Sequence, residues 1–278
     1  TPRYSKIDTY HMTANVIDEA VRQAIILGAN PDKLVGLDNF CWPDPVVSTH
    51  TPDGKYKLAQ LVRSCQALFD TTIHYNTPCI SGKDSMKNDY RKGNKKISVL
   101  PTLLFTVTGI IDDVSKMTSF YFKTPNDIIY LIGETKPHLG ASEYYNIKNI
   151  SGGLVPKVDT KEAMASYKKI HLCIKSGVIK SAHDLSDGGL AVALSEAAFS
   201  GDVGCEIDLT VMDGMATQTP TYNLTIEEKL FSETPSRILV SIDPKNEKSF
   251  LEIMRDVKLY KLGQTTSQKR LIVKNSNQ

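Results

Sequence analysis

The chain has 278 residues, of which 41% are hydrophobic and 23% charged, a composition typical of a soluble globular protein. The net charge of +2 gives no general attraction to nucleic acid or to an anionic membrane, and no apolar run approaches the roughly 20 residues that span a bilayer. The five cysteines are odd in number and lack CxxC spacing, so we expect free thiols in a cytoplasmic protein rather than disulfides or a zinc site. Because the chain does not begin with Met, we expect a fragment or a processed form.

The first 122 residues alternate between predicted helices and strands. Val16, Ala20, Ala24 and Leu27 recur at helical spacing within 12–27, and Gly28 is a stop signal. Strands are expected at 34–38 and 78–81, and the β-branched stretch 97–111, interrupted by Pro101, predicts more. A second amphipathic helix is expected at 56–75, with an inner face of Leu58, Leu61, Val62, Cys65, Leu68 and Phe69.

The pattern changes at a turn-like segment near 119–127, and we place a domain boundary between residues 122 and 123. Beyond it, helices are expected at 160–176, from the glycine pair 188–189 to 199, and at 246–256. Strands are expected at 128–132, 178–183, 205–209, 237–242 and 271–274. This alternation predicts an α+β fold with two lobes.

The segment AHDLSDGGL at 182–190 carries the clearest chemistry. A predicted strand ends in carboxylates, and two glycines then open a helix whose first N–H groups and dipole attract anions. Carboxylates beside such a helix start suit a magnesium phosphate, because Mg²⁺ prefers oxygen ligands. The simpler alternative is that Ser186 or Asp187 only caps the helix.

Two further segments place polar residues beside predicted strands. In ISGKDSM at 80–86, Lys83 is suited to phosphate, Asp84 to metal and Ser85 to a substrate oxygen, although the upstream glycine of a P-loop is absent. In VGLDNFCWP at 35–43, Asp38 is expected at a strand end, where ligand-binding carboxylates often project. A surface turn at 80–86 and an Asx-turn at Asp38 are the alternatives.

Two pairs of polar residues remain ambiguous from spacing alone. Glu19 and Gln23 lie four apart on one helix face, which is typical of a solvated surface. Glu233 and Arg237 in FSETPSR at 231–237 are either an ordinary ion pair or part of a loop that clamps a substrate. No nucleophile and base form a recognisable constellation.

Five strings together resemble the synthetase of the formylglycinamide ribonucleotide amidotransferase family. They are residues 2–29, SGKDSM (81–86), LGASEYY (139–145), AHDLSDGGLAVALSEAAFSG (182–201) and FSETPSR (231–237), and their order matches nearly the whole chain. More distantly, the chain is similar to the aminoimidazole ribonucleotide synthetase superfamily. The resemblance implies a two-lobed α+β fold, with an incomplete N-lobe at 1–122 that forms dimers through its sheet and a C-lobe at 123–278 built as an α/β sandwich.

The resemblance also implies roles for individual residues. Asp38, Gly82 and Ser186 would bind ATP and Ser85 would bind substrate. Glu19, Gln23 and Asp184 would bind Mg²⁺, with Gln23 replacing the Asn usual in the family. Lys83 stands where short family members have a magnesium-binding Asn, and it marks a subtype. The cofactors implied are therefore ATP and Mg²⁺, while no segment matches the family's catalytic histidines or its glutaminase cysteine.

The implied activity is that of an ATP-dependent carbon–nitrogen ligase of purine biosynthesis. The family phosphorylates the formylglycinamide amide oxygen, and ammonia from glutamine displaces phosphate to give the amidine. The implied partners are the missing N-terminal half of the synthetase, a glutaminase subunit or domain and a bridging subunit, and we expect the isolated chain to be inactive and to form a homodimer. The alternatives are a structural nucleotide-binding half without turnover, or another superfamily member such as aminoimidazole ribonucleotide synthetase.

Overall fold

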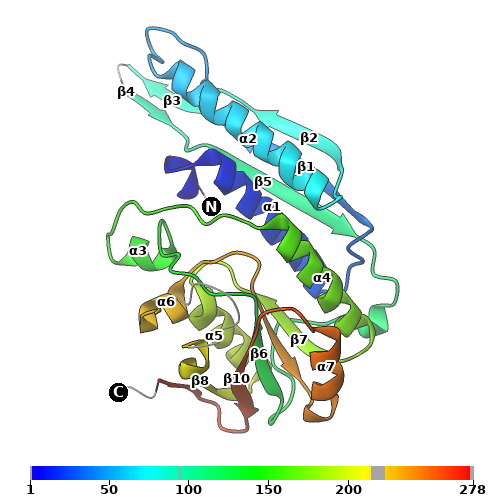
Figure 1. Ribbon diagram of the computed structural model, residues 1–278. Helices are drawn as coiled ribbons and strands as arrows, with labels where there is room; N and C mark the ends of the chain where they lie inside the picture. Colours follow the sequence, from blue (N-terminus) through cyan, green and yellow to red (C-terminus); the bar gives the residue numbers. More distant parts are fainter. Residues whose placement is uncertain (1, 94, 214–222, 276–278) are drawn as a thin grey trace.

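A smaller sheet, a larger sheet, a separate two-stranded hairpin and the helices around them make up the described fold (Figure 1). The computed structural model describes residues 2–93, 95–213 and 223–275. The helices are α1 (Thr9–Ile26), α2 (Gly54–His74), α3 (Glu143–Ile147), α4 (Thr160–Lys175), α5 (Gly189–Gly201), α6 (Ile226–Phe231) and α7 (Glu247–Ile253), with short 3₁₀ turns η1 (Tyr4–Lys6), η2 (Val114–Lys116), η3 (Leu209–Met212) and η4 (Pro244–Asn246). The strands are β1 (Leu34–Cys41), β2 (Cys79–Ser85), β3 (Asp89–Lys92), β4 (Lys95–Ser98), β5 (Thr102–Gly109), β6 (Ile128–Ile132), β7 (Ile179–Asp184), β8 (Gly204–Asp208), β9 (Ile238–Ile242), β10 (Leu259–Thr266) and β11 (Leu271–Lys274).

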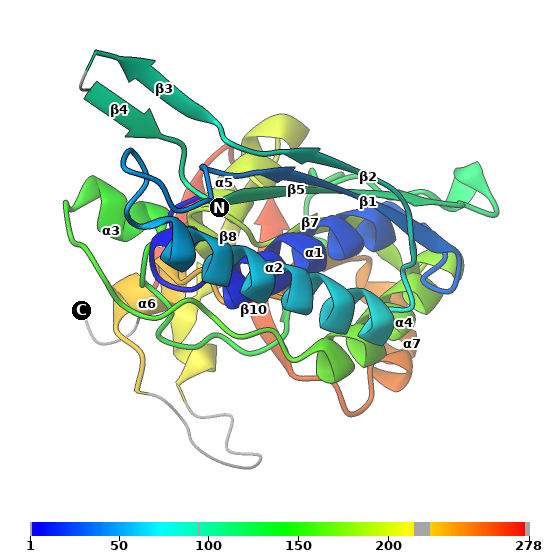
Figure 2. The same cartoon turned by 90° about the horizontal axis from the view of Figure 1, so that it is seen from above.

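The smaller sheet has the strand order β2-β1-β5, with β1 parallel to β2 and antiparallel to β5. Helices α1 and α2 run along one face of this sheet, and the hairpin of β3 and β4 projects from its end (Figure 2). Strand β2 lies at the edge, and its residues are exposed except for Ser85, which is half-buried. Among the described residues, both edges of the sheet, β2 and β5, are therefore unpaired on one side, and one face of the sheet is uncovered (Figure 2).

Helix α1 lies between the two sheets and forms where the sequence predicts a helix. The Asp8 carboxylate caps it by accepting a hydrogen bond from the backbone N–H of His11 at 3.0 Å. Its apolar stripe of Ile17, Val21 and Ile25 is completely buried against residues of both sheets. Burial of this stripe fixes the rotation of α1 and so determines which of its polar residues face the candidate site.

Helix α2 forms as predicted, but its predicted inner face is only partly confirmed: Leu61 and Leu68 are half-buried and pack against the core. Leu58, Val62 and Phe69 are 47%, 61% and 62% exposed, and Cys65 is exposed as well. The buried positions are instead the small residues Gly54, Ser64, Ala67 and Thr71. Small side chains allow α2 to approach α1 closely, and the Ser64 hydroxyl lies 2.5 Å from that of Thr13. Leu58, Val62 and Phe69 consequently face solvent.

The larger sheet has the order β11-β8-β10-β6-β9-β7 and lies between two helical layers. Alternate residues of β6 separate into two cores: Ile128, Tyr130 and Ile132 pack with α4 and α7, whereas Ile129 and Leu131 pack with α5. Burial of both faces explains the continuous apolar sequence of β6 and β9. The layered arrangement agrees with the sandwich expected for the C-lobe, and the mixture of helices and sheets confirms the α+β class.

The division of the chain at residues 122 and 123 stays a prediction, because α1 contacts β5 in one sheet and β7 in the other. Strand β10 at the centre of the larger sheet was not expected from the sequence, nor were the short helices α3 and α6. Among the described residues, the longest apolar helical stretches fall short of what is needed to cross a membrane.

Candidate functional site

The predicted site residues Asp184 and Ser186 lie at the end of β7, directly beside α1. Arg22 of α1 joins them: its Nη2 donates to the Ser186 hydroxyl at 2.8 Å and its Nε lies 3.4 Å from Oδ2 of Asp184. The Ser186 hydroxyl in turn donates to Oδ2 of Asp184 at 2.6 Å. The structure thus brings these two predicted residues together around a buried arginine that the sequence did not single out.

The positive charge of Arg22 is balanced by two buried carboxylates. Its Nη1 donates to Oδ2 of Asp18 at 2.7 Å, and Asp18 also accepts hydrogen bonds from the hydroxyls of Tyr75 and Tyr167 at 2.5 and 2.7 Å. Burial opposes the charge of Arg22, but Asp18 and Asp184 outweigh it and raise its pKa. Burial alone would raise the pKa of Asp184, but nearby His183 and the charge of Arg22 hold it far below the usual range. Both groups therefore stay ionised.

The three residues expected to bind Mg²⁺ are only partly assembled. Glu19 is half-buried and lines a cavity of about 30 Å³ together with Arg22 and Ser186, whereas Gln23 is exposed and does not line it. In the part of the chain that the structure describes, no three His, Cys, Asp or Glu residues are grouped as a metal site.

Oxygen donors for a cation are nevertheless present. Oδ1 of Asp184 lies 3.6 Å from the ring nitrogen Nδ1 of His183. Two carboxylates and an amide are oxygen donors of the kind that Mg²⁺ prefers. Glu19, Gln23 and Asp184 therefore carry oxygen donors that suit the ion in their chemistry, while the exposed Gln23 lies outside the cavity.

Asp38 and Gly82 are direct neighbours, paired across β1 and β2. A Cβ atom on Gly82 would lie 2.7 Å from Oδ1 of Asp38, so only glycine leaves room for that carboxylate. Burial, reinforced by the charge of Asp84, raises the pKa of Asp38. Strand β1 continues to Cys41, so Asp38 lies within a strand, and the expected strand end and the alternative Asx-turn are both wrong.

Ser85 is not on the same face as Asp38 and Gly82. It pairs with Cys41 on β1, and the alternation of side chains along a strand places positions 82 and 85 on opposite faces. Its hydroxyl accepts a hydrogen bond from Nζ of Lys83. Among the described residues, no hydrogen bond or ion pair joins Asp38, Gly82 or Ser85 to the group around Asp184. The predicted residues therefore form two separate clusters.

The start of α5 is built differently from the prediction. Gly188 is its N-cap in a left-handed conformation and has no side-chain cap, so the capping role considered for Ser186 or Asp187 is wrong. The Gly188 N–H instead donates to Oε1 of Glu233 at 2.9 Å. A Cβ atom on Gly189 would lie 2.4 Å from the carbonyl oxygen of Ser232, so glycine is needed there as well. The anion at this helix start is thus the carboxylate of Glu233.

Glu233 joins its own loop to three distant segments of the chain. Besides Gly188, its carboxylate accepts the backbone N–H of Glu143 at 2.8 Å and lies 3.4 Å from the hydroxyl of Tyr4. Burial raises the pKa of Glu233, although the two N–H donors act against the shift. The spacing of Glu233 and Arg237 left the role of Glu233 open. The only sequence signal for Glu233 was that the string FSETPSR resembles the synthetase family.

Arg237 does not pair with Glu233, which corrects the ion-pair alternative. Its guanidinium is completely buried and donates to the Thr135 hydroxyl at 2.9 Å and to the backbone carbonyls of Ser232 and Thr234. Burial, reinforced by the charge of Arg22, lowers the pKa of Arg237 to about 9. Arg237 therefore holds the 231–237 loop in place through hydrogen bonds to its backbone.

Comparison with known proteins supports this architecture. Residues 124–275 match the model of the AIR synthase related protein, C-terminal domain. The chain is 33% identical over 271 residues to the phosphoribosylformylglycinamidine synthase subunit PurL of Thermoplasma volcanium, covering 98% of this chain but only 32% of that protein. It thus spans about a third of the length of this relative.

Solved structures show the same fold at low sequence identity. The structure of Thermotoga maritima PurL complexed with FGAR has a TM-score of 0.73 at 16% identity, covering 98% of this chain and 42% of that one. The structure of PurLQS from Thermotoga maritima has a TM-score of 0.70 at 17% identity, covering 99% and 41%. These likenesses confirm the expected two-lobed fold class. The chain belongs to the AIR synthase related protein family.

Proposed function

We propose that this chain is part of an ATP-dependent ligase that converts formylglycinamide ribonucleotide and glutamine-derived ammonia to formylglycinamidine ribonucleotide. The observation that carries the proposal is the convergence on Glu233: Tyr4, Glu143 and Gly188, which contact its carboxylate, come from three other strings that resemble the synthetase family. The similarity to the PurL subunit extends over 98% of the chain and supports the same assignment.

The proposed chemistry begins with transfer of the ATP γ-phosphoryl group to the amide oxygen of the substrate. This step turns a poor leaving group into phosphate, which ammonia then displaces to form the amidine. The protein contributes chiefly by positioning charge. Bound Mg²⁺ would neutralise phosphate charge, and we assign Glu19, Gln23 and Asp184 to hold it.

The nucleotide and substrate contacts divide between the two clusters. Ser186 is proposed to contact nucleotide phosphate beside Asp184, and Arg22 positions the Ser186 hydroxyl through a hydrogen bond. Asp38 and Gly82 are proposed to contact ATP on one face of the small sheet, and Ser85 is proposed to contact substrate on the other. Because ATP and substrate would then lie on opposite faces of one sheet, they could not meet for phosphoryl transfer, and we infer that a second copy or another half of the synthetase completes the site.

The proposed partners follow from the length of the relatives and from the exposed sheet. We propose that the missing half of the synthetase, a glutaminase subunit or domain and a bridging subunit complete the enzyme in the cytoplasm. We also propose that the isolated chain forms a homodimer through the small sheet, because the β2 edge offers unpaired backbone N–H and C=O groups. The division into lobes at 1–122 and 123–278 is part of this proposal.

A second candidate function is a structural nucleotide-binding half without turnover. The observation that favours it is that Arg22 is already paired with Asp18 and Asp184, beside a cavity of only about 30 Å³. Nucleotide that copurifies with the chain and does not exchange with added labelled ATP would favour this candidate, whereas rapid exchange would favour a catalytic site. Binding of aminoimidazole ribonucleotide synthetase substrate in place of formylglycinamide ribonucleotide would assign the chain to that other family member.

The central experiment measures Mg-ATP binding by calorimetric titration of the purified chain. We expect saturable binding that weakens about tenfold or more in Ser186→Ala, because this hydroxyl is assigned to phosphate. Ser195→Ala is the matched control, since Ser195 lies on α5 and its hydroxyl bonds only to the carbonyl of Ala191 among the described groups. Equal affinity in Ser186→Ala and Ser195→Ala would contradict the assignment. Formation of amidine by the isolated chain from ATP and ammonia would contradict the proposed need for partners.

A further inference from the structure

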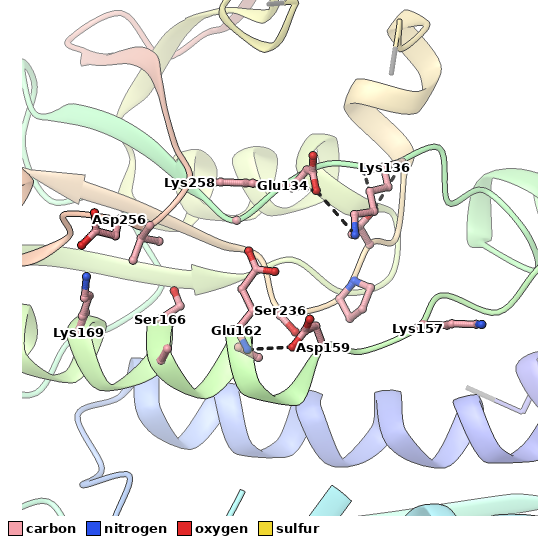
Figure 3. A pocket seen from close by; sticks show the side chains of 16 residues that line it. Glu134, Lys136, Lys157, Asp159, Glu162, Ser166, Lys169, Ser236, Asp256 and Lys258 are labelled. Atoms are coloured by element: carbon pink, nitrogen blue, oxygen red, sulfur yellow. Dashed lines mark hydrogen bonds and ion pairs between the residues drawn. The ribbon is translucent and has the colours of Figure 1, made fainter. Parts of the chain in front are cut away.

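A second and larger cavity lies on the other side of Pro235 from the candidate site. Its volume is about 230 Å³, and it lies between α4 and the loops that follow β6 and precede β9 and β10 (Figure 3). Pro235 lines both this cavity and the small one beside Glu19. Sites for drug-sized ligands usually measure about 300–1,000 Å³, so this cavity suits a metabolite smaller than a nucleotide.

The walls of the cavity carry both signs of charge in equal number, with four lysines and four carboxylates. Glu134 is engaged by Lys258, whose Nζ lies 2.9 Å from Oε2, and by Lys136 at 3.7 Å. Burial alone would lower the pKa of Lys258, but the hydrogen bond to Glu134 raises it, and Lys258 stays charged. Glu162 and Asp256, in contrast, have no ion-pair partner among the described residues.

One polar group in this cavity lacks any partner. Ser166 is 9% exposed, and its hydroxyl makes no hydrogen bond within the part of the chain that the structure describes. It lies on α4 between Glu162, four residues before it, and Lys169, three residues after it, and these three side chains line the cavity along one face of the helix (Figure 3). A buried hydroxyl without a partner is unfavourable, and a bound polar ligand would satisfy it.

The arrangement of charge selects among classes of ligand. Free carboxylates at Glu162 and Asp256 repel a phosphate or another multiply charged anion. The lysines repel a bare divalent cation in the same way. A small zwitterion carries one group of each charge and so complements both the lysines and the carboxylates. The small side chains of Ala163 and Ala165 leave space beside Ser166 for the carbon atoms of the ligand.

We propose that this cavity binds a small zwitterionic metabolite of the free α-amino acid class. The ligand's ammonium group faces Glu162, its carboxylate faces Lys169, and the Ser166 hydroxyl donates a hydrogen bond between them. The site is distinct from the nucleotide and metal cluster, and the inference does not depend on the proposed ligase activity.

The test is calorimetric titration of the full 278-residue chain with each of the common amino acids, without nucleotide or Mg²⁺. We expect saturable binding of at least one amino acid at one site per chain. Binding should weaken about tenfold or more in Glu162→Gln and in Lys169→Met, which is the loss expected when one charged partner is removed. Lys168→Met is the matched control, because Lys168 is a neighbour on α4 that pairs with Asp32 at the surface and does not line the cavity.

A second variant fills the cavity. Ser166→Leu should abolish amino acid binding while leaving the Mg-ATP titration unchanged, which separates this proposal from the proposed function. The proposal is overturned if no amino acid binds to the parent chain, once cooperative unfolding has shown that this chain is folded. Equal affinity for the amino acid in Lys169→Met and Lys168→Met would overturn it too. It is also overturned if inorganic phosphate or Mg²⁺ alone binds with the same sensitivity to these variants.

Discussion

Nε of Arg22 lies 3.4 Å from Oδ2 of Asp184, and both side chains are almost completely buried. The contact joins α1 to the end of β7 and thereby links the two parts of the molecule at the candidate site. A buried ion pair of this kind is costly to break from one side, because the remaining charge loses its partner.

Asp184→Asn should lower the free energy of unfolding by about 3 kcal/mol. This is near the lower end of the range for removing one partner of a buried ion pair, because Arg22 keeps its contact with Asp18. Urea unfolding at neutral pH measures this change. The control is Asp32→Asn, which removes a carboxylate that pairs with Lys168 at the surface and should cost under about 1 kcal/mol. Similar losses in the two variants would show that the Arg22 contact does not stabilise the fold.

His138 should make stability depend on pH. Burial, reinforced by the charges of Lys136 and Arg237, lowers its pKa to about 4 in the folded chain. The unfolded chain, with a pKa of about 6.5, then binds the proton more readily, so stability is complete above pH about 6.5 and falls as the pH drops toward 4.

The size of this effect is about 2 kcal/mol after allowance for partial exposure of the ring. Unfolding free energies measured between pH 4 and pH 8 should show a smaller decline at acidic pH in His138→Asn than in the parent chain. His50→Asn, at an exposed histidine, should keep the parent decline. An unchanged decline in His138→Asn would mean that other groups cause it.

Gly189→Ala should be more damaging than Gly177→Ala. Both glycines have positive φ, +64° and +68°, but a Cβ atom on Gly189 would meet the Ser232 carbonyl oxygen at 2.4 Å, whereas one on Gly177 would meet open space. We expect about 1 kcal/mol of destabilisation for Gly177→Ala and at least about 3 kcal/mol for Gly189→Ala. Thermal and urea unfolding of the two variants measure the difference, and equal losses would argue against close packing of α5 on the 231–237 loop.

Ile80→Lys should convert the proposed homodimer to a monomer without loss of stability. Ile80 is 69% exposed on the edge strand β2, and a lysine there opposes pairing of sheet edges. Light scattering at high protein concentration gives the mass. Val114→Lys, at a 77% exposed residue of η2 outside the small sheet, is the control and should remain dimeric. A parent chain that is already monomeric would rule out the homodimer.

The sequence predicted most elements but not every buried face. The spacing of Val16, Ala20, Ala24 and Leu27 predicted a helix at 12–27, and α1 forms there. Its fully buried stripe is instead Ile17, Val21 and Ile25, while Leu27 is 44% exposed. The same reasoning succeeded only in part for α2: Leu61 and Leu68 pack against the core, but the fully buried positions include the small residues Ser64, Ala67 and Thr71. Strand β10 was missed because it combines Lys261, Gly263 and Gln264 with few apolar residues, and its place in the centre of a sheet is set by its neighbours.

Of the candidate site, the sequence predicted the carboxylate and hydroxyl at 184 and 186 but not Arg22. Patterns of apolar residues place charged side chains outside the core, so the completely buried triad of Asp18, Arg22 and Asp184 has no signal of its own. The sequence also did not predict that Ser85 and Gly82 lie on opposite faces of the small sheet. That placement follows only because β2 extends to Ser85 and its side chains alternate between the two faces.

Thermal melting of the purified chain with and without Mg-ATP tests the central claim most directly, since a ligand that binds only the folded state raises the melting temperature. The account predicts a rise that grows with Mg-ATP concentration and that disappears in Ser186→Ala but persists in Ser195→Ala. An unchanged melting temperature at saturating Mg-ATP would contradict a nucleotide site in this chain.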